Sequence, residues 1–301
     1  MRILVTGSSG LIGSALIPIL KSQGHQIVRL VRHAAAPGED LAVWDPAAGK
    51  LETTALIGTD AVIHLAGESI NALRWTQRRK ERIRSSRVRG TRLLSEALAL
   101  LAVPPRVLVS ASGINFYGSS GDEVLTEKSP AGSGFMSAVC REWEAATEPA
   151  RQRGIRVVNL RIGMVLSMKG GALRAMLPAF KAGVGGKLGS GQQFVSWISI
   201  HDLTRAVSHI LATESLSGPV NAVSPSPVRN VEMTRALGSV LKRPTLLSLP
   251  APAVRIIFGE MGDALLLTSL RAAPERLLAT GFDFQFVDFE LALCHLLSRR
   301  G

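Results

Sequence analysis

Residues 6–13 of the chain read Thr-Gly-Ser-Ser-Gly-Leu-Ile-Gly, which places glycines at positions 7, 10 and 13. The stretch follows an apolar segment, 2–6, that predicts a strand, and it opens a segment, 11–22, that predicts a helix. Glycines at this spacing allow a tight turn, a close approach of the backbone to a pyrophosphate group, and close packing of helix on strand. The first turn of the helix also offers unpaired N–H groups and a positive dipole end to phosphates. The stretch therefore predicts a dinucleotide cofactor at the N-terminal end of the chain.

The residue after the second expected strand indicates which dinucleotide is bound. That strand covers 26–31, and Arg32 follows it. A protein specific for NAD usually has an acidic residue here, about 20 residues past the glycines, which holds the ribose 2′-hydroxyl. An arginine instead suits a 2′-phosphate, to which it can form two parallel hydrogen bonds. We therefore expect NADP(H); the alternative is a solvated surface arginine.

Strand and helix patterns alternate through the first half of the chain. Strands are expected at 2–6, 26–31, 42–44, 60–66, 106–110 and 156–161, and helices at 11–22, 74–101 and 134–152. Such alternation is typical of parallel βαβ units. We therefore expect an α/β fold with a doubly wound parallel sheet of the Rossmann type.

The pattern is looser after residue 162, where glycine-rich loops are frequent. Further helices are expected near 172–182, 201–213, 230–241 and 288–299. We expect residues 1–162 to form the NADP-binding domain, with a later segment, about 195–213, returning to it. Residues 163–301 would form mainly a smaller C-terminal lobe for the substrate.

The positive charge of the chain is concentrated in one segment. The net charge is +12, and +8 of it lies between Arg74 and Arg92, where nine basic residues accompany one acid, Glu81. The segment could be a solvated helix face, or it could face the cofactor or an anionic substrate, with Arg82 and Arg87 as the contacts. Nucleic acid is the least favoured partner because Trp75 is the only aromatic residue between positions 69 and 115. We therefore expect a small-molecule substrate and no nucleic acid.

Cysteine and histidine usage argues against a metal site. The two cysteines, Cys140 and Cys294, give neither a disulfide framework nor a Cys-rich metal site, and no two histidines have the spacing of a zinc-binding helix. Unpaired thiols are typical of a reducing compartment, so we expect a cytoplasmic protein. No apolar run approaches the length of about 18 residues that spans a bilayer, so we expect no membrane association. The oligomeric state is left open.

Several further motifs resemble one protein family. They are DAVIHLAGE at 60–68, RVRGT at 87–91, SASGINFYG at 110–118, REWEAA at 141–146, LRIGMVLS at 160–167, GSGQQFVSWISIHDL at 189–203 and PERLLATGFDF at 274–284. Together with the glycine-rich stretch they are similar to the extended short-chain dehydrogenases/reductases. They resemble most an atypical branch, the epimerase-family or nucleoside-diphosphate-sugar-epimerase-like proteins. The resemblance covers essentially the whole chain.

The resemblance implies a set of cofactor-binding residues. The pyrophosphate would lie on Gly7, Ser9, Gly10, Leu11, Ile12 and Gly13, and the 2′-phosphate on Arg32. Leu65, Ala66 and Gly67 would line the adenine-ribose side. Arg87 stands where the family usually has an asparagine, so its contact with the cofactor would be altered. Ser110 and Ser112 would lie beside the nicotinamide.

The residue pair of the superfamily's usual mechanism is missing. That mechanism uses Tyr-x-x-x-Lys, in which the lysine lowers the pKa of the tyrosine and the phenol transfers a proton as hydride moves. The only tyrosine is Tyr117, and Gly121 stands four residues later. In the window 134–144, the tyrosine position falls on Phe135 or Met136 and the lysine position on Val139 or Cys140. The remaining candidates for catalysis are Ser112, Tyr117 and Cys140.

Two functions remain open. The chain could be an oxidoreductase or epimerase with an atypical active site, acting on a small, anionic or sugar-like substrate. It could also be a non-catalytic NADP(H)-binding regulator or sensor.

Other polar residues are expected to have structural roles. His64 lies in an apolar strand and is expected to be a hydrogen-bonded core residue. Asp202 is expected to stabilise the first turn of a helix. Trp143 and Glu144 are expected to serve packing and to carry a solvated or capping charge.

Overall fold

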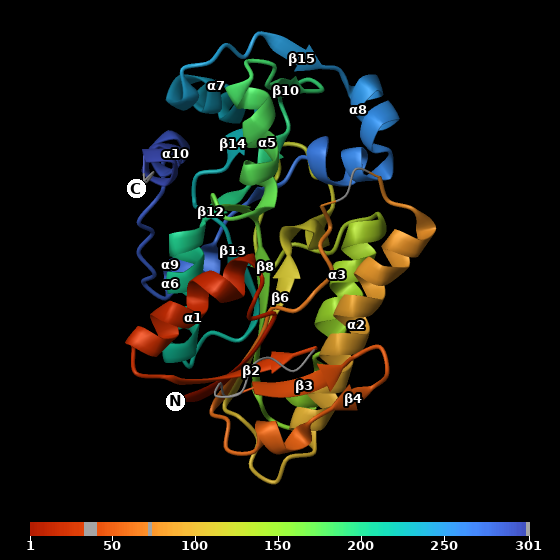
Figure 1. Cartoon of the computed structure of the whole chain (residues 1–301), viewed down its shortest axis with the longest axis vertical. Helices are drawn as coiled ribbons and strands as arrows, with labels where there is room; N and C mark the ends of the chain where they lie inside the picture. Colours follow the sequence, from red (N-terminus) through yellow and green to blue (C-terminus); the bar gives the residue numbers. More distant parts are fainter. Residues whose placement is uncertain (33–40, 72–73, 299–301) are drawn as a thin grey trace.

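The computed structural model describes residues 1–32, 41–71 and 74–298 (Figure 1). Its centre is an eight-stranded sheet with the strand order β13-β8-β6-β5-β1-β2-β3-β4. The strands are β1 (Arg2–Thr6), β2 (Gln26–Val31), β3 (Leu41–Asp45), β4 (Lys50–Leu51), β5 (Ala61–His64), β6 (Val107–Gly113), β8 (Arg156–Ile162) and β13 (Gly218–Ala222). Every neighbouring pair is parallel except β3 and β4. The strand order reverses between β1 and β5, which confirms a doubly wound sheet of the Rossmann type.

Helices cover both faces of the sheet because side chains alternate along each buried strand. In β1, Ile3 and Val5 face a core shared with α1 (Leu11–Ser22) and α6 (Ile200–Ala212). Leu4 faces the opposite core, to which α2 (Gln77–Ala99) and α4 (Glu148–Gln152) contribute. The helix α3 (Phe135–Ala145) packs beside α2.

The smaller elements of the second half gather beyond the carboxyl ends of the large sheet, at the top of Figure 1. They include α5 (Gly171–Lys181), α7 (Asn230–Leu241), α8 (Ala251–Phe258), a π-helical turn (Gly262–Leu266) and α10 (Phe289–Ser298), whereas α9 (Glu275–Ala279) packs against β13 beside α6. Two-stranded pairs join β7 (Val124–Leu125) to β16 (Arg271–Ala272), β9 (Met164–Leu166) to β12 (Trp197–Ser199), β10 (Gly186–Leu188) to β15 (Leu247–Leu249), and β11 (Phe194–Val195) to β14 (Val228–Arg229). Short 3₁₀ helices lie at Thr53–Leu56 and Ile114–Tyr117.

Two of the differences from the expectation concern the large sheet and the helices that cover it. The helix expected at 134–152 is broken into α3 and α4, because Pro149 lies in the first turn of α4 and cannot continue the hydrogen bonding of α3. The edge strand β13 was not expected, since its sequence, Gly-Pro-Val-Asn-Ala, has two residues that weaken strands. At the edge of a sheet Pro219 is tolerated, because one side of the strand needs no partner. Residue 299, at the end of the last expected helix, lies outside the described residues.

A buried carboxylate ties α6 to the chain near the C-terminus. Asp202 is fully buried in the first turn of α6, where Ser199 caps the helix through its hydroxyl oxygen. The carboxylate accepts hydrogen bonds from the backbone N–H groups of Gln285 (2.9 Å) and Phe286 (3.0 Å), and from the Ser199 hydroxyl (3.0 Å). The expected structural role of Asp202 is therefore extended by a long-range contact.

We predict that Asp202→Asn lowers the free energy of unfolding by about 2 to 3 kcal/mol, because the amide group has one acceptor where the backbone offers two donors. Asp283→Asn makes the same change at an exposed position of the same segment, and it should change stability by less than about 0.5 kcal/mol. Urea unfolding of both variants measures the difference. Equal stability of the two variants would contradict the role given to Asp202.

Candidate functional site

The glycine-rich turn lies directly against the segment that follows β5. Gly7 has a positive φ of 66°, and a Cβ built on it would lie 2.7 Å from the carbonyl carbon of Leu65. A Cβ on Gly13 would overlap the carbonyl oxygen of Gly7. Gly10 differs, since its Cβ would meet only that oxygen, at 3.2 Å. Gly7 and Gly13 are therefore required by the packing of the turn, whereas Gly10 leaves room in front of the helix.

The N-terminus of α1 is suited to an anion. Gly10 precedes the helix and no side chain caps it, so the amides of Leu11, Ile12 and Gly13 have no intrahelical acceptor. These amides and the helix dipole together favour a negatively charged group in front of the turn.

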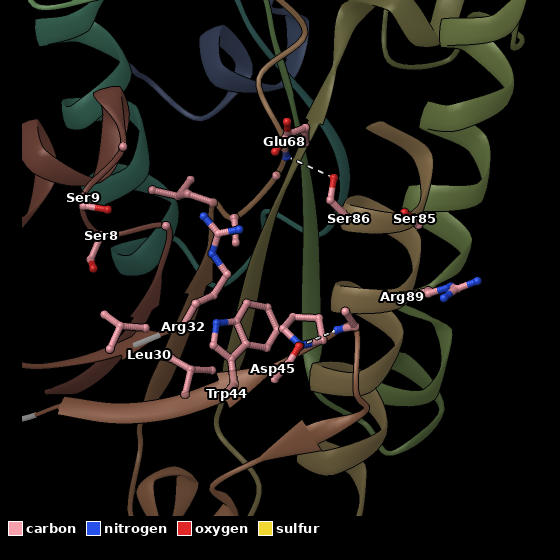
Figure 2. Close-up of a pocket in the computed structure, with 18 of the residues that line it drawn as sticks. Ser8, Ser9, Leu30, Arg32, Trp44, Asp45, Glu68, Ser85, Ser86 and Arg89 are labelled. Atoms are coloured by element: carbon pink, nitrogen blue, oxygen red, sulfur yellow. Dashed lines mark hydrogen bonds between the residues drawn. The ribbon is translucent and has the colours of Figure 1, made fainter. Parts of the chain in front are cut away.

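A pocket of about 530 Å³ opens beside this turn (Figure 2). It lies over the carboxyl ends of β1, β2, β3 and β5 and against α2. The expected cofactor residues that line it are Gly7, Ser9, Gly10, Arg32, Leu65, Ala66, Gly67 and Arg82. In Figure 2 the Arg32 side chain extends from the end of β2 across the pocket, while Arg89 on α2 points away from it. The volume is in the range of small-molecule sites.

Residues at the end of β3 also form this pocket, and sequence reasoning did not identify them. Trp44, Asp45 and Pro46 all line it. Trp44 is buried against Gly90 of α2, where a Cβ would lie 3.4 Å from the indole. The Asp45 carboxylate accepts hydrogen bonds from the amides of Ala47 and Ala48 and so fixes the turn. The signal that was missed is that the short strand expected at 42–44 ends at the same sheet edge as the glycine-rich turn.

A buried histidine holds the segment after β5 in place. His64 Nδ1 is 2.7 Å from Thr6 Oγ1, and its Nε2 is 2.9 Å from Thr91 Oγ1. Thr6 Oγ1 in turn accepts hydrogen bonds from the amides of Leu65 and Ala66, which line the pocket. Burial lowers the pKa of His64 to about 4, so the ring is neutral near pH 7. His64 is therefore the hydrogen-bonded core residue that was expected.

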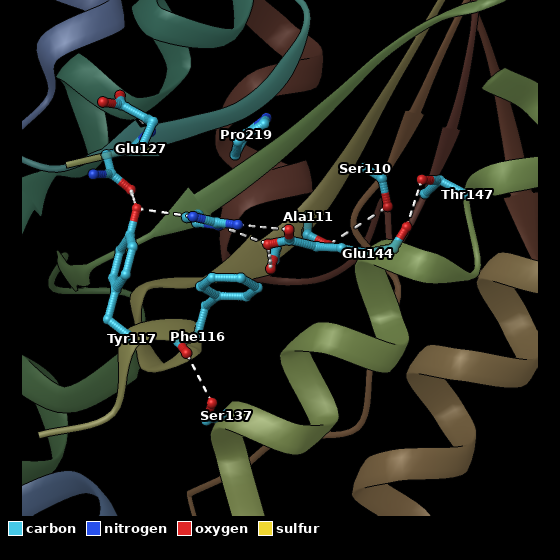
Figure 3. A network of polar contacts seen from close by, with 12 residues as sticks. Ser110, Ala111, Phe116, Tyr117, Glu127, Ser137, Glu144, Thr147 and Pro219 are labelled. Atoms are coloured by element: carbon cyan, nitrogen blue, oxygen red, sulfur yellow. Dashed lines mark hydrogen bonds and ion pairs between the residues drawn. The ribbon is translucent and has the colours of Figure 1, made fainter. Parts of the chain in front are cut away.

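A buried polar network lies at the carboxyl ends of β6 and β8 (Figure 3). The Ser112 hydroxyl donates to Glu144 Oε1 at 2.8 Å, and Arg161 forms two hydrogen bonds of 2.8 Å with the Glu144 carboxylate. Arg161 Nη1 donates to the Tyr117 hydroxyl at 3.0 Å, and that hydroxyl donates to Asn221 Oδ1 at 2.7 Å. The structure thus brings Ser112 and Tyr117 into one chain of contacts.

This network changes the interpretation of Glu144. The expected solvated or capping charge is wrong: the side chain is 12% exposed and forms a bidentate ion pair with Arg161. Arg161 is the next-to-last residue of β8, in the sequence Val-Asn-Leu-Arg-Ile, and it is 3% exposed; a buried charge is rarely left without a partner. An arginine in that pattern is the signal that predicts a buried acid nearby.

The three candidates for catalysis are poorly placed to transfer protons. Burial raises the pKa of Tyr117, and its proton is engaged by Asn221. Burial raises the pKa of Cys140 to about 12, so its thiol stays neutral. The Ser112 proton is directed at Glu144. Ser110 is fully buried within β6 and does not line the pocket.

Apolar side chains occupy the position of the superfamily tyrosine. Met136 is buried in a cluster with Trp75, Ile83 and Met261, and Phe135 packs against the same cluster. The cluster joins α3 and α2 to the segment around α8 and the π-helical turn. Methionine and phenylalanine offer no proton to a reacting group.

The basic stretch between Arg74 and Arg92 is largely engaged by contacts within the protein. Ion pairs join Arg79 to Glu68 (2.6 Å), Lys80 to Glu260 (2.9 Å), Arg84 to Glu142 (2.6 Å) and Arg92 to Glu96 (3.9 Å). Arg74 donates to the carbonyl oxygens of Ile256 and Ile257 at the end of α8. Part of the positive charge therefore attaches the C-terminal lobe to α2, and Arg82 faces the pocket.

Within residues 1–32, 41–71 and 74–298, no group of three or more His, Cys, Asp or Glu side chains could hold a metal ion. No helix in the same ranges is long and apolar enough to cross a membrane.

Comparison with known proteins identifies the family. The sequence pattern of the NAD dependent epimerase/dehydratase family matches residues 3–222. The chain belongs to this family. A domain of unknown function, DUF1731, matches residues 249–296. The resemblance inferred from the sequence motifs is therefore confirmed.

Relatives from distant organisms match over nearly the whole chain. The epimerase family protein Mb2239 of Mycobacterium bovis is 44% identical, over 99% of this chain and 98% of that protein. The crystal structure of the human epimerase family protein SDR39U1, solved with NADPH, has a TM-score of 0.89 and 34% identity, and the match covers 99% of this chain and 100% of that one. The UDP-N-acetylglucosamine 4-epimerase of Bacillus cereus has a TM-score of 0.76 at 19% identity, which shows a shared fold only.

The buried His64 predicts a dependence of stability on pH. The unfolded chain binds a proton at this histidine below about pH 6.5, whereas the folded chain does so only near pH 4. Stability is therefore complete above pH 6.5 and is lost as the pH falls, by about 2 kcal/mol at pH 5. His64→Gln keeps hydrogen-bonding groups without a charge, so this part of the pH dependence should disappear. Urea unfolding at pH 7 and pH 5 measures it, and equal losses in both proteins would contradict the assignment.

Proposed function

We propose that the chain binds NADP(H) in the pocket beside the glycine-rich turn. The observation that carries the proposal is the position of Arg32, which reaches into this pocket from the end of β2. A guanidinium group there suits a 2′-phosphate, whereas an acidic residue would suit a 2′-hydroxyl. The NADPH bound to human SDR39U1, a relative over the full length, supports the same choice.

The residues of the pocket fit the parts of this cofactor. The free amides of α1 would hold the pyrophosphate, and the absence of a side chain at Gly10 leaves space for it. Arg32 would pair with the 2′-phosphate, and Arg82 adds positive charge on the opposite wall. Leu65, Ala66 and Gly67 would line the adenosine side. A bound NADP(H) would supply or accept a hydride at its nicotinamide end.

We further propose an oxidoreductase or epimerase that acts on a small anionic or sugar-like molecule, with an atypical active site. Family membership supports this class of reaction. A specific observation favours the alternative, a non-catalytic NADP(H)-binding sensor or regulator: Ser112, Tyr117 and Cys140 are all held in buried contacts or in a neutral form. Oxidation of bound NADPH by a carbonyl substrate would decide for the enzyme.

The remaining expectations concern partners and location. We propose a small-molecule substrate, with neither nucleic acid nor membrane as a partner, because many basic side chains of α2 are engaged by carboxylates and carbonyls of the chain itself. We propose a cytoplasmic location because Cys140 and Cys294 are both free thiols.

Arg32→Ala tests the choice of cofactor. We expect NADPH to bind about 10- to 100-fold more weakly, since a charge-assisted hydrogen bond to a charged group contributes about 1.5 to 3 kcal/mol. NADH, which lacks the 2′-phosphate, should bind with nearly unchanged affinity. Arg153→Ala removes the same charge from an exposed position near the start of β8, and it should leave both affinities unchanged. Calorimetric titration measures the four values; wild-type protein that binds NADH as tightly as NADPH would refute the proposal.

Gly10→Val tests the site itself. A valine at this position projects into the space in front of α1, so we expect NADPH binding to be lost while the melting temperature changes little. Gly13→Ala provides the contrast, because its Cβ overlaps the Gly7 carbonyl oxygen and should lower the melting temperature. Titration and thermal unfolding of both variants distinguish the two effects. Normal NADPH binding by a folded Gly10→Val protein would show that the cofactor site lies elsewhere.

A further inference from the structure

Residues 251–266 form a separate unit at one end of the crevice. The unit consists of α8, a short connection and the π-helical turn, which pack chiefly against each other. It lies above α2 and α3 in Figure 1. The carbonyl oxygen of Ala264 in the π-helical turn accepts a hydrogen bond of 3.4 Å from the side-chain amide of Asn115, two residues after the end of β6. The unit therefore stands over the strand end where Ser112 would lie beside a nicotinamide.

The side of this unit that faces α3 is apolar. Met261 is buried in the cluster that contains Met136 and Trp75, and Phe258 packs against the same cluster. Met136 occupies the position of the superfamily tyrosine. Methionine is unbranched and flexible, so a contact built on two methionines tolerates rearrangement of its partners.

The opposite side of the unit faces solvent. Ile256 is 70% exposed and Ile257 is 41% exposed, and Arg255 pairs with Asp263 of the same unit. A segment that is packed on one side only belongs to the least stable part of a protein, where local opening costs little free energy. The lids of ligand sites are drawn from such segments.

The first side chain that holds the unit in place is Arg74, at the start of the basic segment. Its guanidinium donates hydrogen bonds to the backbone carbonyl oxygens of Ile256 and Ile257. These carbonyls belong to the last turn of α8 and carry the negative end of its dipole, which a cation stabilises. Arg74 is itself exposed, so water and salt ions compete for this contact.

The second side chain is Lys80, on the first turns of α2. Its Nζ lies 2.9 Å from Oε2 of Glu260, in the connection between α8 and the π-helical turn. The same ammonium group lies 4.7 Å from the centre of the Phe135 ring at the start of α3. Lys80 therefore joins α2 and α3 to the unit. Because Glu260 is 45% exposed, this ion pair contributes only a small free energy and is screened by salt.

We propose that residues 251–266 are a lid over the nicotinamide end of the crevice, and that Arg74 and Lys80 latch it shut. The inference rests on the proposed binding of NADP(H) and adds how exchange of the cofactor is controlled. The closed lid covers the end of β6, so a dinucleotide that extends there leaves only when the lid opens. The latch is strong enough to favour the closed lid and weak enough to release it, since both of its contacts are polar and exposed to water.

The test follows lid opening by hydrogen exchange of the amides of residues 254–266 in ligand-free protein, and NADPH release by stopped-flow fluorescence. We expect Lys80→Glu to speed both by about 3-fold or more, because it places a negative charge beside Glu260. Adding Glu260→Lys restores the attraction with the charges exchanged, and both rates should return to within about 2-fold of wild type. Raising the salt concentration should speed both processes in wild type.

Arg84→Glu is the matched control. It breaks an ion pair of the same helix, 2.6 Å long, that joins α2 to Glu142 of α3 and not to the lid. It should leave both rates unchanged. Arg74→Met provides a second variant at the latch, and it should change both rates in the same direction as Lys80→Glu.

The possible results separate this inference from the proposed function. If wild type does not bind NADPH, the proposed function is wrong, and hydrogen exchange still tests the latch. If wild type binds NADPH and neither Lys80→Glu nor Arg74→Met speeds exchange of the lid amides, the latch is overturned and the function stands. Equal effects of Arg84→Glu and Lys80→Glu would overturn it as well. Faster hydrogen exchange without faster NADPH release would overturn the control of the cofactor by the lid.

Discussion

The close approach of two backbone segments is the constraint on which the rest of the site depends. The turn at Gly7 lies so near Leu65 that any side chain at that glycine would overlap the neighbouring backbone. This contact sets the carboxyl ends of β1 and β5 side by side at the point where the strand order reverses, and so defines the crevice. His64 holds the segment after β5 in place through its hydrogen bonds with Thr6 and Thr91. The glycines and the neutral imidazole of His64 thus hold in place the backbone that lines the pocket.

The two parts of the crevice differ in how their charged side chains are paired. Beside the glycine-rich turn, Arg32 and Arg82 line the pocket. On the other side Glu144 and Arg161 neutralise each other, and the hydroxyls of Ser112 and Tyr117 are used to complete their hydrogen bonding. A buried ion pair needs such partners, because leaving either charge incompletely bonded is costly. The groups that could transfer protons therefore serve first to make the buried pair stable.

The sequence predicted the parts of the fold that depend on local patterns. The limits of β1, α1 and β2 agree with expectation because alternation, helical periodicity and glycine punctuation coincide there. The strand β13 was missed because pairing with β8 at the sheet edge outweighs the unfavourable Gly and Pro of its sequence. The glycine-rich turn predicted the pocket, but Trp44 and the Glu144–Arg161 pair were not assigned to sites. Trp44 packs against Gly90, which is 46 positions away along the chain, and Glu144 of α3 pairs with Arg161 of β8, which is 17 positions away. No local spacing reveals such contacts.

The residues of α3 at the superfamily's tyrosine and lysine positions limit the chemistry that this site can perform. Met136 and Cys140 lie one helical turn apart, at the spacing of the superfamily's proton donor and its cation, and neither can take those roles. Arg87 supplies a cation nearby, but neither Met136 nor the neutral Cys140 thiol supplies a proton. A cation without a proton donor can bind and orient a cofactor and can stabilise negative charge, yet it cannot protonate a product. Turnover at this site therefore needs a proton donor outside α3, whereas a protein that only holds NADP(H) needs none.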